Sequence, residues 1–201
     1  MSDDKKSWYA GGDKATKVKA SGSSRMPGCH TNFRRITFHS EGVDRTCDGG
    51  AHVASLARYV VQQNIYYHMV YCPDCGHWAQ IIPIEHAARA MKGGSVCSAG
   101  NSANRHGLLN IQICIAAYGT SAKKLPPPSK WKNTKKFKKI VDDWDINPKS
   151  LDYSKQIRSK EKWCKEDKGF AGHQHGPTDD HNDIQPNKFD FKAFKKDVLK
   201  K

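Results

Sequence analysis

Residues 111–118 read IQICIAAY, and this short stretch decides the fold class. A nearly continuous apolar run of this length is typical of a strand buried on both faces, whereas a strand with one solvent-exposed face alternates apolar and polar residues. The run is also far shorter than the roughly 18 apolar residues that a membrane helix needs. The sequence therefore predicts a sheet whose central strand is covered on both sides.

Two further β-prone segments flank a turn-forming sequence. Residues 65–71 and 77–82 are rich in aromatic and β-branched side chains, and the CPDCG stretch at 72–76 lies between them. This order predicts a β-hairpin. Residues 35–39, RITFH, predict another short strand that ends at His39, because Ser-Glu-Gly follows directly.

Helical spacing of apolar residues appears on both sides of these strands. Residues 51–64 have this spacing, with Asp48 near their start as a candidate cap, and residues 137–144 place four apolar side chains on one face. A helix is also expected at the start of 85–107, before a Gly, Ser and Asn loop, and in the C-terminal segment after Phe189. The order of elements predicts an α/β fold with a mixed central sheet flanked by helices.

The chain length and composition favour a single domain over residues 1–201, which is large enough to carry an active site. Residues 1–30 read as a loop or arm, and residues 123–201 as a basic helical part of the same domain. Residues 1–120 contain 13 Lys and Arg against 8 Asp and Glu, and residues 121–201 contain 21 against 12. The resulting net charge of +14 favours encounter with a polyanion, whether nucleic acid, anionic lipid or an acidic wall polymer, without choosing among them.

The start of the chain has no apolar stretch of the kind found in a secretory signal, so synthesis in a cytoplasm is expected. The seven cysteines are odd in number and irregularly spaced, which favours reduced thiols over a disulfide framework. Cys72 and Cys75 form the one CxxC motif. A plain hairpin turn is the simpler interpretation, and a small second metal site or a redox pair is the alternative.

Metal-binding residue types are concentrated in AGHQHGPTDDHNDIQP, residues 171–186, where prolines and turn formers predict a loop. His173 and Asp183 are ten residues apart, a separation that suits two sides of a loop folded over a metal. A catalytic zinc site takes three protein ligands and keeps one open position. His39, at a strand end, is the best placed third ligand, although ten histidines allow many other triplets.

Four ordered motifs resemble the zinc-dependent N-acetylmuramoyl-L-alanine amidases, the type 2 amidases related to peptidoglycan recognition proteins, and in particular their phage endolysin branch. The motifs are ITFHSEG, IYYHMVYCPDCGHWAQIIP, IQICIAAYG and GHQHGPTDDHND, and the resemblance extends over about residues 8–199. It implies a single amidase-like domain with one zinc ion. It also implies hydrolysis of the amide bond between N-acetylmuramic acid and L-alanine in bacterial peptidoglycan.

The resemblance implies particular roles for residues at the motif positions. His39, His173 and Asp183 correspond to the zinc ligands. Tyr67 corresponds to a tyrosine beside the reacting water, His181 to a residue that stabilises the transition state, and His86, more weakly, to a histidine of the substrate groove. The spare groups His175, Asp179 and Asp180 are expected to be solvated or to hydrogen-bond the ligands.

Two departures from the family pattern concern the site. The family usually continues from the acidic ligand as Asp-Pro-Gly, whereas this chain reads Asp183-Ile184-Gln185-Pro186. A family glutamate on the strand at 110–117 is replaced by Cys114. This replacement leaves the catalytic roles to Tyr67 and His181.

The resulting expectation is a monomeric endolysin that is held in the host cytoplasm before release and then acts on the bacterial cell wall. It is expected neither to bind nucleic acid nor to insert into a membrane. The alternative is a recognition module that binds peptidoglycan without cutting it. A basic zinc protein that binds nucleic acid is a third possibility, supported by charge and the CxxC motif alone.

Overall fold

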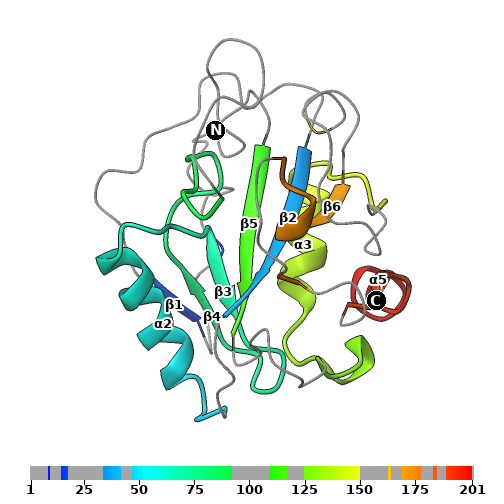
Figure 1. The fold of residues 1–201 in the computed structure, drawn as a ribbon. Helices are drawn as coiled ribbons and strands as arrows, with labels where there is room; N and C mark the ends of the chain where they lie inside the picture. The colour runs from blue at the N-terminus through cyan, green and yellow to red at the C-terminus, as the bar shows by residue number, and fades with distance from the viewer. Residues whose placement is uncertain are drawn as a thin grey trace, which may run out of the picture.

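The computed structural model describes residues 9, 15–17, 34–41, 47–91, 109–116, 125–149, 163, 169–177, 183–184 and 189–200. Six strands form one sheet in the order β1-β4-β3-β5-β2-β6 (Figure 1). They are β1 (Ala15–Lys17), β2 (Arg34–Ser40), β3 (Met69–Tyr71), β4 (Trp78–Gln80), β5 (Leu109–Ile115) and β6 (Gly169–Gly172).

The sheet is mixed, as predicted. The strands β3, β5, β2 and β6 run parallel to one another, while β4 is antiparallel to β3 and parallel to β1. The predicted hairpin is confirmed, with Met69 opposite Gln80 and Tyr71 opposite Trp78. The prediction of a loop over residues 1–30 is wrong at Ala15–Lys17, because this segment forms β1 and pairs with β4 of the hairpin. Strand β6 was not predicted, and it pairs with β2.

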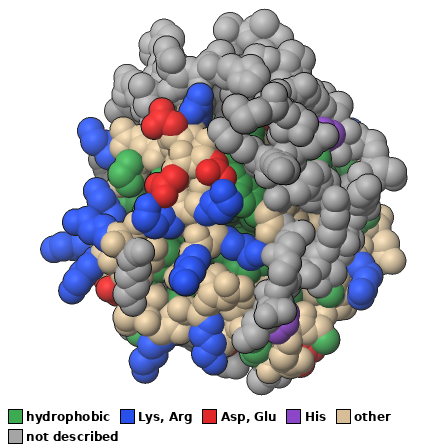
Figure 2. Space-filling view, turned by 180° about the vertical axis from the view of Figure 1, so that it is seen from behind, with side chains coloured by type: hydrophobic (Ala, Val, Ile, Leu, Met, Phe, Trp, Pro, Cys, Tyr) green, Lys and Arg blue, Asp and Glu red, His purple; other side chains and the backbone are tan. Residues whose placement is uncertain are grey.

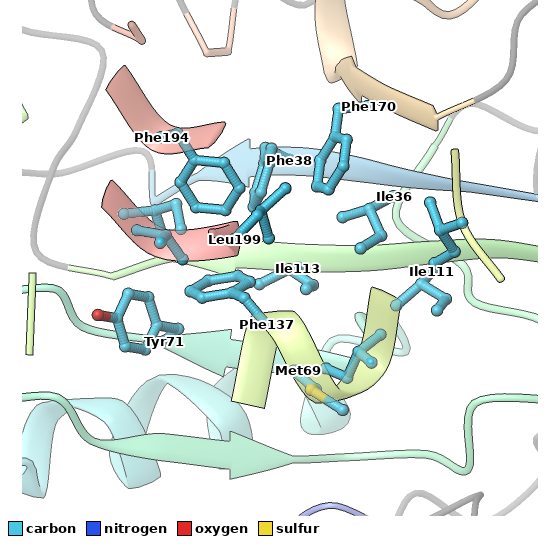
Figure 3. Close-up of a cluster of buried hydrophobic side chains, with 14 of the residues drawn as sticks. Ile36, Phe38, Met69, Tyr71, Ile111, Ile113, Phe137, Phe170, Phe194 and Leu199 are labelled. Atoms are coloured by element: carbon cyan, nitrogen blue, oxygen red, sulfur yellow. The ribbon is translucent and has the colours of Figure 1, made fainter. Parts of the chain in front are cut away.

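The central strand β5 is buried on both faces, which confirms the interpretation of IQICIAAY. Its side chains alternate between two apolar clusters. On one face, Ile111, Ile113 and Ile115 join Phe38 of β2 in the larger cluster. Figure 3 shows this cluster, in which helix side chains including Phe137 and Phe194 pack over β2 and β5.

The helix α2 (Ala51–Gln62) covers the other face, where Val53, Leu56 and Val60 pack against Cys114 of β5 and its neighbours. Asn64 follows the helix with a left-handed φ of 58°, a conformation in which asparagine commonly ends helices. The residue before the helix is Gly50, and Asp48 accepts hydrogen bonds from both the backbone N–H and the ring of His52.

The remaining helical elements are η2 (Pro128–Lys130), α3 (Lys135–Asp143), η3 (His173–His175), α5 (Phe191–Phe194) and η4 (Lys195–Leu199). They confirm the expected helices near 137–144 and after Phe189. The helix expected at the start of 85–107 is wrong. Residues 87–90 belong to no helix or strand, and the Arg89 N–H donates to the Tyr66 carbonyl instead of a helical partner. Within the described part of the chain, no helix combines the length and apolarity needed to cross a bilayer.

Candidate metal centre

Strand pairing brings His39 and His173 together. In the parallel pair of β2 and β6, Phe38 lies opposite Gly172, so the next residue along each chain is a histidine at the same carboxyl edge of the sheet. Ligand-binding groups commonly gather at this edge, because parallel strands all end there. The centroids of the two imidazole rings are 4.4 Å apart.

Asp183 reaches the same place from the late loop. Its Oδ1 lies 3.0 Å from His173 Nδ1, and its Oδ2 lies 3.7 Å from His39 Nδ1. The Ser40 N–H donates to Oδ2 at 3.1 Å, and the Gln174 N–H donates to the Asp183 carbonyl at 3.1 Å. Backbone hydrogen bonds therefore hold the carboxylate against the end of β2 and the Asp183 backbone against η3.

This group has the donor chemistry of a zinc site. Each of His39, His173 and Asp183 is buried, and each offers one ligand atom within 4.8 Å of the others. Two imidazole nitrogens and one carboxylate oxygen form a common ligand set for catalytic zinc. Burial alone would raise the pKa of Asp183, but the hydrogen bond and charge of His173, the charge of His39 and the Ser40 N–H lower it below its ordinary value. The carboxylate is thus ionised and available to a cation.

Tyr67 lies beside His39, with ring centroids 5.0 Å apart. Burial raises the pKa of Tyr67 well above its ordinary value, and neighbouring Cys114 and Asp183 raise it further. The phenol therefore stays protonated and acts as a hydrogen-bond donor, here to the Cys114 sulfur. Burial likewise raises the pKa of Cys114, followed by the charges of Glu41 and Asp183. Cys114, opposite His39 in the β2–β5 pair, is a neutral thiol and cannot replace a glutamate as a base.

Glu41 is a site neighbour that sequence reasoning missed. Only 4% of it is exposed, and its charge raises the pKa of both Tyr67 and Cys114. The signal was present in the strand alternation, because residues two apart on a strand face the same side. Glu41 follows His39 by two, and its N–H continues the ladder to the Ile115 carbonyl.

Two further histidines in these motifs support the backbone. The buried ring of His68 accepts from the Gln112 N–H at Nδ1 and donates from Nε2 to the carbonyls of Ile84 and His86. Burial lowers the pKa of His68 to about 4, so the ring is neutral at pH 7. His175 is buried and accepts from the Gly172 N–H at 2.8 Å, which corrects the expectation that it is solvated.

Comparison with known proteins identifies the fold. No family model matches the chain, and no curated protein does. Among solved structures, AmpD superposes with a TM-score of 0.55 at 14% identity over 94% of this chain and 97% of that one. The endolysin N-acetylmuramoyl-L-alanine amidase LysCS of Clostridium intestinale gives a TM-score of 0.51 at 11% identity, over 93% and 96%. The chain has the N-acetylmuramoyl-L-alanine amidase fold.

In a third structure with this fold, the superposition covers a smaller share of the other protein's chain. The hydrolase AmiA of Staphylococcus aureus, solved with its ligand, gives a TM-score of 0.50 at 12% identity. The superposition covers 81% of this chain and 66% of AmiA. At these identities the likeness establishes the amidase fold alone.

Of the remaining expected site residues, the structure describes His86 but not His181, Asp179 or Asp180. The His86 carbonyl accepts from His68, as noted, and the His86 N–H donates to the Pro83 carbonyl, while its groove role stays a prediction. His181, Asp179 and Asp180 lie outside the described residues. The expected loop at 171–186 is wrong at its start, where β6 ends and η3 begins. The chain leaves Asp183 through a cis peptide bond to Ile184, which is buried in the larger core cluster.

Proposed function

We propose that this chain is a peptidoglycan amidase that uses one zinc ion held by His39, His173 and Asp183. The observation that supports this most strongly is the convergence of these three buried side chains at the carboxyl edge of an amidase-fold sheet. The bond cleaved is the amide between the lactyl group of N-acetylmuramic acid and L-alanine of the stem peptide.

The bound zinc supplies Lewis-acid chemistry, because it acidifies water and polarises an amide carbonyl. The protein residues around it perform the remaining tasks. Asp183 contributes a negative charge that partly neutralises the dication, and Ser40 fixes the orientation of that carboxylate through its N–H. Neutral imidazoles at His39 and His173 leave the site net positive, which favours the negative charge that develops on the carbonyl oxygen during attack.

Tyr67 is proposed to donate a hydrogen bond to the developing oxyanion. The raised pKa of its phenol keeps the proton in place over the working pH range, and its ring lies against that of His39. The phenol donates to Cys114 in the free protein, so substrate binding would exchange one acceptor for another. His181 is proposed to transfer a proton to the departing amine, a role that suits an imidazole with a pKa near 6.5.

The substrate context proposed is that of a phage-type endolysin that reaches the wall from the host cytoplasm. The face in Figure 2 presents more Lys and Arg than Asp and Glu side chains among the described residues. Such a surface favours encounter with an anionic wall. Two of the α3 lysines, however, pair with carboxylates one turn on, Lys138 with Asp142 and Lys139 with Asp143. Those two lysines are therefore solvated helix residues whose charges are already paired within α3.

Product analysis tests the proposal. Purified wild-type protein and His39→Gln are incubated with muropeptides, and His52→Gln serves as a matched histidine control outside the site. Mass spectrometry should detect free stem peptide with the wild type and the control, and none with His39→Gln. Tight binding of muropeptides without any release by the wild type would instead support a recognition module and refute the amidase.

A further inference from the structure

Three cysteines away from the proposed active site bring their sulfurs together. Cys47, Cys72 and Cys75 each offer a sulfur within 4.8 Å of the other two. Cys47 lies shortly before α2, and the other two frame the turn between β3 and β4. Cys72 is buried, whereas Cys47 and Cys75 are partly exposed, so solvent and ions can reach the cluster.

The turn is folded in a way that places both of its sulfurs on one side. The Gly76 N–H donates to the Cys72 carbonyl at 2.9 Å, and the Cys72 N–H donates to the His77 carbonyl at 3.0 Å. Gly76 has a φ of 72°, which glycine adopts without strain, and a Cβ there would strike the backbone of Lys132. The Lys132 N–H in turn donates to the Pro73 carbonyl at 3.0 Å. The two cysteines are therefore held in position by the fold itself.

Backbone donors point at these sulfurs. The N–H groups of Asp74 and Cys75 donate to the Cys72 sulfur, and the N–H of His77 donates to the Cys75 sulfur. Burial outweighs these N–H groups, so the pKa of both thiols is raised overall although the N–H groups lower it. Donors of this kind stabilise sulfur in its anionic form, which is the form that binds metals. A turn that only reversed the chain would not need them.

We propose that Cys47, Cys72 and Cys75 form a second metal site that binds a thiophilic divalent cation of the zinc class. Each thiol releases one proton on binding, and the three thiolates occupy three tetrahedral positions. Water takes the fourth, because the partly exposed Cys47 and Cys75 open the cluster to solvent. Zinc accepts sulfur ligands readily, and a C-x-x-C pair supplies two of the ligands in many zinc sites.

Such an ion would join the chain before α2 to the β3–β4 turn. Both segments border the cluster of apolar residues on the α2 face, which contains Cys72 and against which Cys47 and Cys75 pack. Metal binding would thus fasten α2 to the sheet and add to folding stability. A disulfide would use two of the sulfurs and leave the third without a function, whereas a cation uses all three.

Cobalt(II) substitution tests the site in the full-length protein. The reduced protein is stripped with a chelator and titrated with Co²⁺, and absorption is recorded in the near ultraviolet. A thiolate-to-cobalt charge-transfer band should appear in the wild type and saturate at about one equivalent for this cluster. Absence of the band in the wild type would overturn the proposal, and this arm does not depend on any variant folding.

Variants then assign the band. It should disappear in the double variant Cys72→Ser/Cys75→Ser and weaken in Cys47→Ser, whereas Cys114→Ser, a buried thiol outside the cluster, should keep it. The variant Asp183→Ala should also keep it, which separates failure of this site from failure of the catalytic one. A band that persists in the double variant contradicts the proposal. So does a disulfide between two of Cys47, Cys72 and Cys75 in the purified wild type, located by mass spectrometry of its peptides under non-reducing conditions.

Discussion

His39 and His173 stand next to each other because β2 and β6 are paired in parallel, with Phe38 opposite Gly172 and the two imidazole rings 4.4 Å apart. They are 134 positions apart in the chain. A sheet is stiff, so this pairing sets the separation of two metal ligands before any metal arrives. Asp183 comes from a separate segment, and the Ser40 N–H at the end of β2 donates to its carboxylate.

Replacement of Tyr67 by phenylalanine should reduce kcat by about 100-fold to 1000-fold, which is the usual effect of losing one oxyanion donor. Zinc content should not change, since Tyr67 is not among the grouped ligands. Steady-state hydrolysis of muropeptides and metal analysis measure the two effects. Tyr59→Phe, on the exposed side of α2, is the matched control and should behave as wild type. Equal activity of both variants would remove Tyr67 from the mechanism.

Cys114→Ser should leave the shape of the pH–rate profile unchanged. The thiol is buried and its pKa is raised, so it is neutral at working pH and takes no part in proton transfer. Serine keeps an oxygen that can accept the Tyr67 hydrogen bond. If the variant lost one limb of the wild-type profile, Cys114 would be acting as an acid or a base, against this interpretation.

The ring of His68 should make stability depend on pH. Its pKa is about 4 in the folded protein, compared with about 6.5 in an unfolded chain, so the unfolded state binds more protons between these values. The free energy of unfolding is therefore fully retained above pH 6.5 and falls as the pH drops toward 4. The loss is about 2 kcal/mol between pH 7 and pH 5. Urea titrations of the chelator-treated protein should show this decrease, and His68→Gln should lack that share of it. An identical pH dependence in the two proteins would contradict the assignment.

Phe194→Ala should destabilise the fold by about 3 to 5 kcal/mol, the usual cost of removing a buried phenylalanine ring. The Phe194 ring packs against those of Phe38 and Phe137, with centroids 5.6 and 5.3 Å away, and thereby docks α5 on the sheet. Thermal or urea unfolding measures the effect. Tyr59→Ala removes an aromatic ring that is 57% exposed and should cost far less. Similar losses for both variants would mean that α5 contributes little to the core.

Strong local patterns predicted much of the fold. The apolar run of β5, the turn within the hairpin and the helical spacing of α2 and α3 each depend on neighbouring residues, and each was found as expected. The short strands β1 and β6 were missed because β6 is GFAG, which has few β-prone side chains, and β1 is formed by pairing. Residues 85–91 have helix-forming alanines, yet Ala87 and Ala88 are buried and Arg89 bonds to Tyr66, so tertiary contacts overrode propensity.

The candidate site was predictable only in part. Residue types and a strand end pointed to His39, and the composition of the late loop pointed to His173 and Asp183. Which histidine completes the group depends on the β2–β6 register, which no local pattern contains, so the triplet came from the family resemblance. Glu41 was missed because a lone acidic residue before a glycine reads as a surface turn, and its burial follows from the ladder to β5.

The most direct test is the zinc content and hydrolytic activity of Asp183→Asn, which keeps the shape of the side chain and removes its charge. The variant should hold about one zinc ion per chain fewer than the wild type and should release no stem peptide. Asp142→Asn, an exposed carboxylate on α3, should match the wild type in both measurements. Full zinc content together with full hydrolysis in Asp183→Asn would contradict the claim that the β2 end and the late loop jointly hold a catalytic metal.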